Sequence, residues 1–162
     1  MSLLKLLREL KKTEKEAKVL ILGLDNAGKT TILKTFAEEE ITSIMPTKGF
    51  NVKQMNYQGF KLSVWDIGGQ REIRDYWQMF FEGTDALIYI VDSSDEMRLK
   101  ESTEELQQLL VEEKLLNKPV LVFANKQDLQ FALDAEHVMA SLKLMEIKDR
   151  NWNIQACSAV TQ

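Results

Sequence analysis

The chain has 162 residues, enough for one domain with a substantial core and too few for two domains of ordinary size. Its net charge of −4 argues against a nucleic-acid partner, because nucleic-acid-binding proteins usually carry a basic excess. One cysteine cannot form an internal disulfide, which suits a reducing cytoplasm, and no apolar run is long enough for a membrane span. We also expect a monomer.

The first predicted element is an amphipathic helix with its linker over residues 1–16, ahead of a single domain at 17–162. Residues 1–18 hold six basic and three acidic side chains, whereas the rest of the chain is acidic. One helical face gathers four leucines: Leu3, Leu6, Leu7 and Leu10. One alternative for such a helix is that it simply packs permanently on its domain.

The stretch GLDNAGKT, Gly23 to Thr30, follows an apolar strand at 18–22 and precedes a helical pattern at 31–38. A glycine, four residues and Gly-Lys-Thr form a P-loop, in which backbone N–H groups and a helix N-terminus surround phosphate groups. In this setting Lys29 is predicted to reach the β- and γ-phosphates, and Thr30 to offer its hydroxyl to Mg²⁺.

Two further strands are predicted at 50–57 and 60–65, and Gln58-Gly59 joins them as a β-hairpin. Apolar and polar residues alternate in the second strand, which ends in WDIGGQ. At the end of this strand Asp66 is predicted to hold Mg²⁺ through water, Gly69 to give a backbone N–H to the γ-phosphate, and Gln70 to orient an attacking water. In the preceding segment PTKGF, Thr47 is a candidate ligand for both Mg²⁺ and the γ-phosphate.

The remaining pattern predicts strands at 86–91, 120–124 and 153–156, and helices at 96–116 and 135–142. Alternating strands and helices indicate an α/β fold with a mainly parallel six-stranded sheet and helices on both faces. Ligands of such sheets bind beyond the carboxyl ends of the strands, where the motifs lie.

The strand at 120–124 ends in NKQD. Asp128 is predicted to accept the N1–H and N2–H groups of guanine, a donor pair that adenine lacks. Asn125 is expected to connect this loop to the P-loop, and the stem of Lys126 to cover the base. Ser158 and Ala159, in CSA, are predicted to lie at guanine O6. Cys157 is expected to be a small buried residue and His137 a solvated one.

The motifs GLDNAGKTT, PTKGFNV, WDIGGQ, FANKQDL and IQACSA occur in the order typical of the Arf family of small GTPases, which the chain resembles over nearly its whole length. The details resemble its Arf-like 3 branch most, then its Arf-like 2 branch. The resemblance implies the P-loop small-GTPase fold (the G domain) with GTP or GDP and Mg²⁺ as ligands. It also implies a final helix, so we expect the natural protein to continue beyond Gln162.

Residue by residue, the resemblance implies a set of phosphate-binding positions, which comprises Asp25, Asn26, Ala27, Gly28, Lys29, Thr30 and Thr31. It implies Thr30 and Thr47 as magnesium ligands, and Gln70 as the residue that positions water. Hydrolysis is expected to be slow and stimulated by a GTPase-activating protein, with an exchange factor as a further partner. The family's effector-binding aromatic cluster corresponds to Phe50, Trp65 and Phe80, although these side chains could simply be core.

The resemblance also implies that the N-terminal helix is released in the GTP state and makes weak, transient contact with a membrane. Ser2 excludes N-myristoylation, because that modification needs glycine at this position. The family usually has proline after the arginine at position 74, whereas Asp75 follows here, which puts the path of the following segment in question.

Three functions remain open. The first is a GTPase switch that releases lipidated cargo from carrier proteins, in the cytoplasm or at cilia. The second is a GTP-binding scaffold with negligible turnover, or an Arf-like 2 type regulator of tubulin folding at microtubules. The third, a P-loop kinase or ATPase, is disfavoured by Asn125–Asp128.

Overall fold

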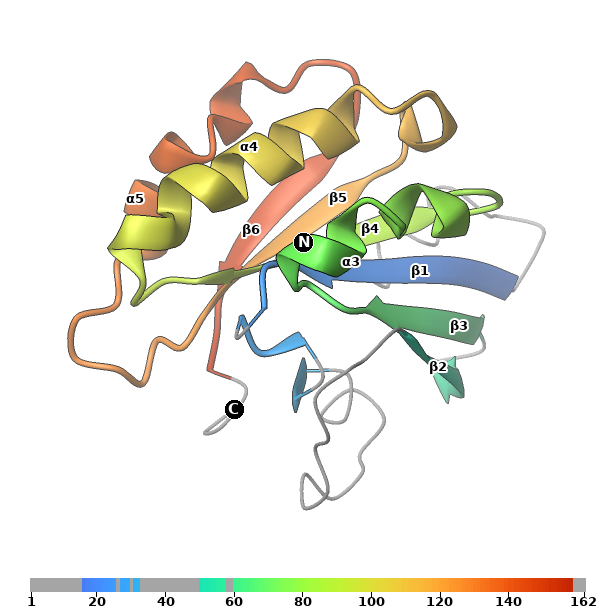
Figure 1. Cartoon of the computed structure of the whole chain (residues 1–162), viewed down its shortest axis with the longest axis horizontal. Coiled ribbons are helices and arrows are strands. Elements are labelled where there is room, and N and C mark those ends of the chain that lie inside the picture. Colours follow the sequence, from blue (N-terminus) through green and yellow to red (C-terminus); the bar gives the residue numbers. More distant parts are fainter. Residues whose placement is uncertain (1–15, 26, 30, 33–49, 58–59, 159–162) are drawn as a thin grey trace.

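The computed structural model describes residues 16–25, 27–29, 31–32, 50–57 and 60–158. They form a six-stranded sheet in the order β2-β3-β1-β4-β5-β6 (Figure 1). The strands are β1 Glu16–Gly23, β2 Phe50–Tyr57, β3 Phe60–Ile67, β4 Ala86–Asp92, β5 Val120–Asn125 and β6 Trp152–Ala156. β2 is antiparallel to β3, and all other neighbours are parallel, which confirms the predicted sheet.

Both faces of the central strands are buried, which is why these strands are continuous apolar runs rather than alternating ones. In β1, Val19 and Ile21 point into one core cluster while Leu20 and Leu22 point into the other, and all four are inaccessible to solvent. The strands β4 and β5 divide their side chains between the two faces in the same way. Their period of two residues therefore distributes one sequence run over two cores.

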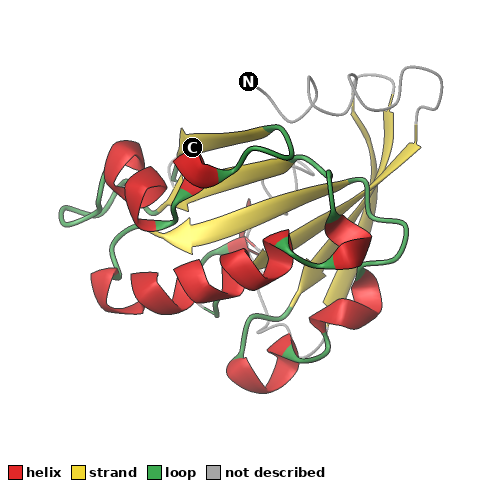
Figure 2. Ribbon diagram, turned by 90° about the horizontal axis from the view of Figure 1, so that it is seen from above, coloured by secondary structure: helices red, strands yellow, loops and turns green. Residues whose placement is uncertain are grey.

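One face is covered by α4 Leu99–Leu110 and α5 Ala135–Ser141, with the short helices α3 Arg71–Arg74, η2 Trp77–Phe80, η3 Glu96–Arg98, η4 Glu113–Leu115 and η5 Leu144–Glu146 (Figures 1 and 2). Leu106 and Leu109 of α4 pack beneath it against the sheet. The opposite face receives Ile32, whose N–H donates to Gly28 O in the helical pattern predicted after the P-loop.

The prediction of one helix over 96–116 is wrong at both ends. A 3₁₀ turn occupies Glu96–Arg98, where Asp95 accepts a hydrogen bond from the N–H of Arg98, and α4 ends at Leu110. Arg150, from the approach to β6, donates to the carbonyls of Leu110 and Leu115, at 2.6 and 3.0 Å. These contacts satisfy carbonyls at the helix end, and they come from a residue that the local pattern does not include.

After β3 the chain forms one helical turn, α3, and then the 3₁₀ helix η2. Trp77, the first residue of η2, is buried in the core, and its indole N–H donates to Gly68 O at 2.8 Å. The chain around Asp75 therefore follows a short helical path that is anchored to the end of β3. Within the described residues, no helix combines the length and apolar character that a membrane span requires.

Candidate nucleotide site

The predicted motifs lie at one edge of the sheet, because four parallel strands carry them at their carboxyl ends. β1 leads into the P-loop, β3 into Gly68-Gly69-Gln70, β5 into Lys126-Gln127-Asp128, and β6 into Cys157-Ser158. Hydrogen bonds join the loops across this edge. Asp25 N donates to Gly69 O, Gln127 N to Cys157 O, and Cys157 N to Ala124 O.

Lys29 lies within the P-loop with only 7% of its surface exposed, and its ammonium donates to the carbonyl of Leu24 at 3.0 Å. Burial lowers the pKa of Lys29 to about 8, although the negative charges of Asp66 and Asp25 act to raise it. A buried cation that is costly to keep charged is suited to an anionic ligand, whose charge would replace the lost hydration. This electrostatic demand fits a phosphate group.

The P-loop also has the close backbone approach that a phosphate cradle needs. Gly28 has a φ of +98°, and a Cβ placed there would lie 2.3 Å from Nδ2 of Asn125. That amide donates to Ala27 O at 2.8 Å, which is the predicted connection between NKQD and the P-loop. Only glycine leaves room for this contact, so Gly28 allows the NKQD segment to connect directly to the P-loop.

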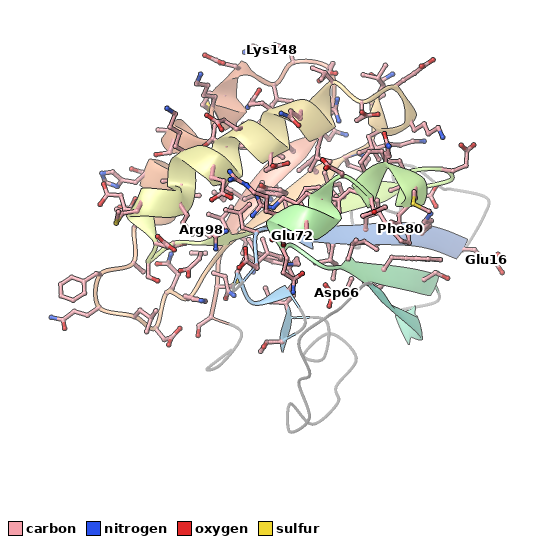
Figure 3. The ribbon with its side chains drawn as sticks, viewed as in Figure 1. Glu16, Asp66, Glu72, Phe80, Arg98 and Lys148 are labelled. Atoms are coloured by element: carbon pink, nitrogen blue, oxygen red, sulfur yellow. The ribbon has the colours of Figure 1, made fainter. Side chains whose placement is uncertain are left out.

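The end of β3 lies against the P-loop. Asp66, labelled in Figure 3, is fully buried and close enough to Lys29 for its charge to raise that pKa. Gln70 is half-buried. A Cβ on Gly69 would lie 2.3 Å from Gly23 O. The backbone of Gly69 therefore lies so close to the end of β1 that it leaves no room for a side chain. The three predicted residues thus lie beside the phosphate loop, as the sequence suggested, and their roles stay predictions.

The base motif is held in place by partners from two neighbouring strands. Lys126 has a φ of +66°, and its Nζ lies 2.9 Å from Asp92 Oδ2 at the end of β4. Asp128 accepts from Ser158 Oγ at 2.7 Å. Cys157 is half-buried against the core, and burial raises its pKa to about 11, so the thiol is protonated at neutral pH. His137 is exposed as expected.

Sequence reasoning missed three charged residues of this region. Asp92 pairs with Lys126, and its position at the end of a parallel strand was a signal that could have identified it. Arg74 and Arg98 both contact Asp25 of the P-loop. Partial burial alone would raise the pKa of Asp25, but the hydrogen bond and charge of Arg98 outweigh burial and hold it below its ordinary value. No sequence pattern pointed to the contacts of these arginines with Asp25.

The predicted aromatic cluster is described in part. The rings of Trp65 and Phe80 are in contact, with centroids 5.9 Å apart and an angle of 51° between planes. Both side chains are partly buried and pack against the core. Their burial fits a core role, and their partial exposure leaves the role in effector binding open. Lys18 Nζ lies 4.8 Å from the Trp65 ring and donates to Phe80 O at 2.7 Å. In the view of Figure 3, Phe80 and Arg98 lie on opposite sides of Glu72 in α3.

Several predicted residues lie outside the described part of the chain: Asn26, Thr30, Thr47, Ala159 and most of the N-terminal segment 1–16. Phe50 belongs to β2, of which the backbone alone is described. Among the described residues, no group of three acidic, histidine or cysteine side chains gathers as a metal site. A metal ion here would therefore depend on phosphate oxygens, hydroxyls and water in addition to Asp66, the donor set that Mg²⁺ prefers in such sites.

Comparisons with known proteins show which family the chain resembles in sequence. The sequence profile of the ADP-ribosylation factor family matches residues 3–162. ADP-ribosylation factor-like protein 3 of Chlamydomonas reinhardtii is 60% identical over 159 residues, 98% of this chain and 90% of that protein. ADP-ribosylation factor-like protein 2 of Dictyostelium discoideum is 50% identical over 161 residues, 99% of this chain and 88% of that protein.

The fold agrees as well. The solved structure of the Arl6 BBS3 small GTPase from Trypanosoma brucei, with the bound nucleotide analogue GppNp, superposes with a TM-score of 0.84. It is 32% identical in sequence, and the match covers 90% of this chain and 88% of that one. The family profile and the relatives together establish that this chain belongs to the ADP-ribosylation factor family of small GTPases.

Proposed function

We propose that the protein binds GTP and GDP with Mg²⁺ at the carboxyl edge of its sheet and acts as a nucleotide-dependent switch. The observation that carries this proposal is the hydrogen bond from Asn125 Nδ2 to Ala27 O, which joins the base motif to the phosphate motif. The GppNp bound by the Trypanosoma brucei relative supports the same ligand class. When bound, Mg²⁺ would neutralise charge on the phosphates, with Asp66 holding it through water.

Selection of the base is assigned to Asp128, whose carboxylate accepts from Ser158 and has further acceptor capacity for two guanine donors. Asp128→Asn should weaken GDP binding by a factor of about 100 or more and favour xanthine nucleotides, since the amide donates where the carboxylate accepts. The matched control is Asp149→Asn. In the wild-type chain, the carboxylate of Asp149 pairs with Arg150 at the end of α4 that is far from this motif. Equal affinity of the wild-type chain for ATP and GTP would refute guanine selectivity.

Hydrolysis is assigned to Gln70, which would orient the attacking water while the backbone N–H of Gly69 binds the γ-phosphate. Lys29 would remain protonated against the β- and γ-phosphates. Gln70→Leu is expected to bind GTP with unchanged affinity and to lose most single-turnover hydrolysis, because the water loses its partner. A wild-type chain that binds GTP without hydrolysing it, even with an activating protein, would favour the scaffold function instead.

The finer role we propose is release of lipidated cargo from carrier proteins by the GTP form, in the cytoplasm with peripheral membrane contact. The Arf-like 3 relative supports this choice, and Trp65 forms an aromatic pair with Phe80, the last residue of the short helix η2. Immobilised protein with a non-hydrolysable GTP analogue should capture such a carrier, and Trp65→Ala should lose it. Phe131→Ala is the control, because Phe131 is 83% exposed and lies outside this surface. Capture in the GDP form, or in neither form, would refute the cargo role.

A further inference from the structure

Arg74 at the end of α3 is a buried cation that the proposed chemistry does not use. Its side chain is only 5% exposed, so its charge must be compensated by protein groups rather than by water. Nε donates to Gly69 O at 2.8 Å and Nη1 to Glu101 Oε1 of α4 at 2.6 Å. Nη2 lies 3.5 Å from Asp25 Oδ1, and Nη1 lies 3.5 Å from Glu105 Oε1.

The carbonyl that Arg74 contacts belongs to the peptide group between Gly69 and Gln70. The same oxygen accepts from the N–H of Asp25, at 3.2 Å, so two donors from different segments fix it. A peptide group is planar, so hydrogen bonds that restrain its oxygen also restrain the direction of the Gln70 N–H and the position of the Gln70 Cα. Arg74 therefore acts on the position of Gln70 through the backbone that precedes it.

A second arginine contacts the same two carboxylates. Arg98, at the end of η3, donates to Asp25 Oδ1 at 2.7 Å, to Asp25 O at 3.1 Å and to Glu101 Oε2 at 3.2 Å. Asp25 and Glu101 thus each contact both guanidinium groups. Charged hydrogen bonds shared in this way connect the P-loop, α3 and α4, and they are stronger than neutral ones.

We propose that Arg74 is a positioning residue for GTP hydrolysis, which holds the Gly69–Gln70 peptide against the phosphate loop with α4 as its anchor. This inference rests on the proposed function, because Gln70 is the residue that it positions. Lysine could not replace Arg74, since one ammonium group cannot reach a carbonyl and carboxylates on three segments at once.

The test compares Arg74→Met with Arg150→Met in the full chain with GDP and Mg²⁺. Arg150 is a matched control: its side chain is 1% exposed and donates to the carbonyls of Leu110 and Leu115, remote from the phosphate loop. The first readout is amide hydrogen exchange of Asp25, relative to Leu22 in β1. Exchange of Asp25 should become faster by about tenfold or more in Arg74→Met, the factor expected for a lost charged hydrogen bond, and stay unchanged in Arg150→Met.

The second readout is single-turnover hydrolysis. Arg74→Met should hydrolyse GTP at least about tenfold more slowly, with GDP affinity within about twofold of wild type, and Arg74→Lys should not restore the rate. Arg150→Met should lose thermal stability and keep the wild-type rate. If Arg74→Met does not fold, Glu101→Gln, which removes the charge opposite Nη1, should move both readouts in the same direction.

The results separate the two proposals. Unchanged exchange at Asp25, or hydrolysis by Arg74→Met as fast as by Arg150→Met, would overturn the positioning role. A wild-type chain that does not hydrolyse GTP would overturn both the proposed GTPase function and the role of Arg74 in it. Faster exchange at Asp25 together with slower hydrolysis, both confined to the Arg74 and Glu101 variants, would establish it.

Discussion

Nucleotide affinity should decrease as the pH rises above about 8, because the P-loop lysine loses its proton there. Burial lowers the pKa of Lys29 to about 8 in the protein without ligand, and a bound polyphosphate would raise it again. Binding therefore favours the protonated amine. Below the pKa of the free protein, the amine is charged in both the free and the nucleotide-bound protein, and the affinity is constant. Above that pKa, binding must take up a proton, and affinity falls.

The size of the effect follows from this pKa. With half of the free protein deprotonated at about pH 8, affinity for GDP should fall by about tenfold between about pH 7 and pH 9, equivalent to about 1.4 kcal/mol. The assay is an equilibrium titration with a fluorescent GDP analogue and Mg²⁺. Hydrolysis does not enter this measurement, because the diphosphate is the product state.

Lys29→Arg is the control for this experiment, because a guanidinium does not titrate in this range. This variant should bind more weakly at every pH, since the longer planar group does not fit the buried site, but its affinity should lack the slope. Any deprotonation of the base acts equally on both proteins and cancels in the comparison. Equal slopes for the two proteins, or a flat wild-type profile, would refute the assignment of Lys29 to the phosphates.

Three further outcomes are expected. Leu106→Ala should lower the free energy of unfolding by about 2–5 kcal/mol in urea denaturation, since this side chain is fully buried under α4; a loss comparable to a surface substitution would contradict that packing. Gly69→Ala should cost about 1–3 kcal/mol and weaken binding of a GTP analogue, because its Cβ would meet Gly23 O at 2.3 Å and Asp25 N at 2.6 Å; unchanged analogue affinity would place Gly69 away from the phosphates. Asp134 raises the pKa of His137, so their pairing stabilises the protein below the ordinary pKa of histidine and is lost as pH rises through the raised value. The melting temperature of the wild-type protein should therefore decrease slightly between about pH 6 and pH 8, and this decrease should be absent in His137→Gln.

The sequence by itself determined the strands and the chemistry at their ends. β4 and β5 are runs of apolar residues too short for helices and flanked by turn residues, so their type follows from the local pattern. The residue types that suit phosphate and guanine follow these runs directly in the chain. Parallel strands bring such ends to one edge, and the site could be expected there before any coordinates were available.

Only the tertiary structure decided where α4 ends and what holds the segment after β3. The end of α4 depends on Arg150, which lies 40 positions from Leu110, and Arg74 meets Asp25 across 49 positions. The low pKa of Lys29 likewise depends on burial by other segments. Local periodicity reports which face of an element is apolar, but contacts between residues distant in the chain arise only when the sheet forms, and they fix the site's geometry.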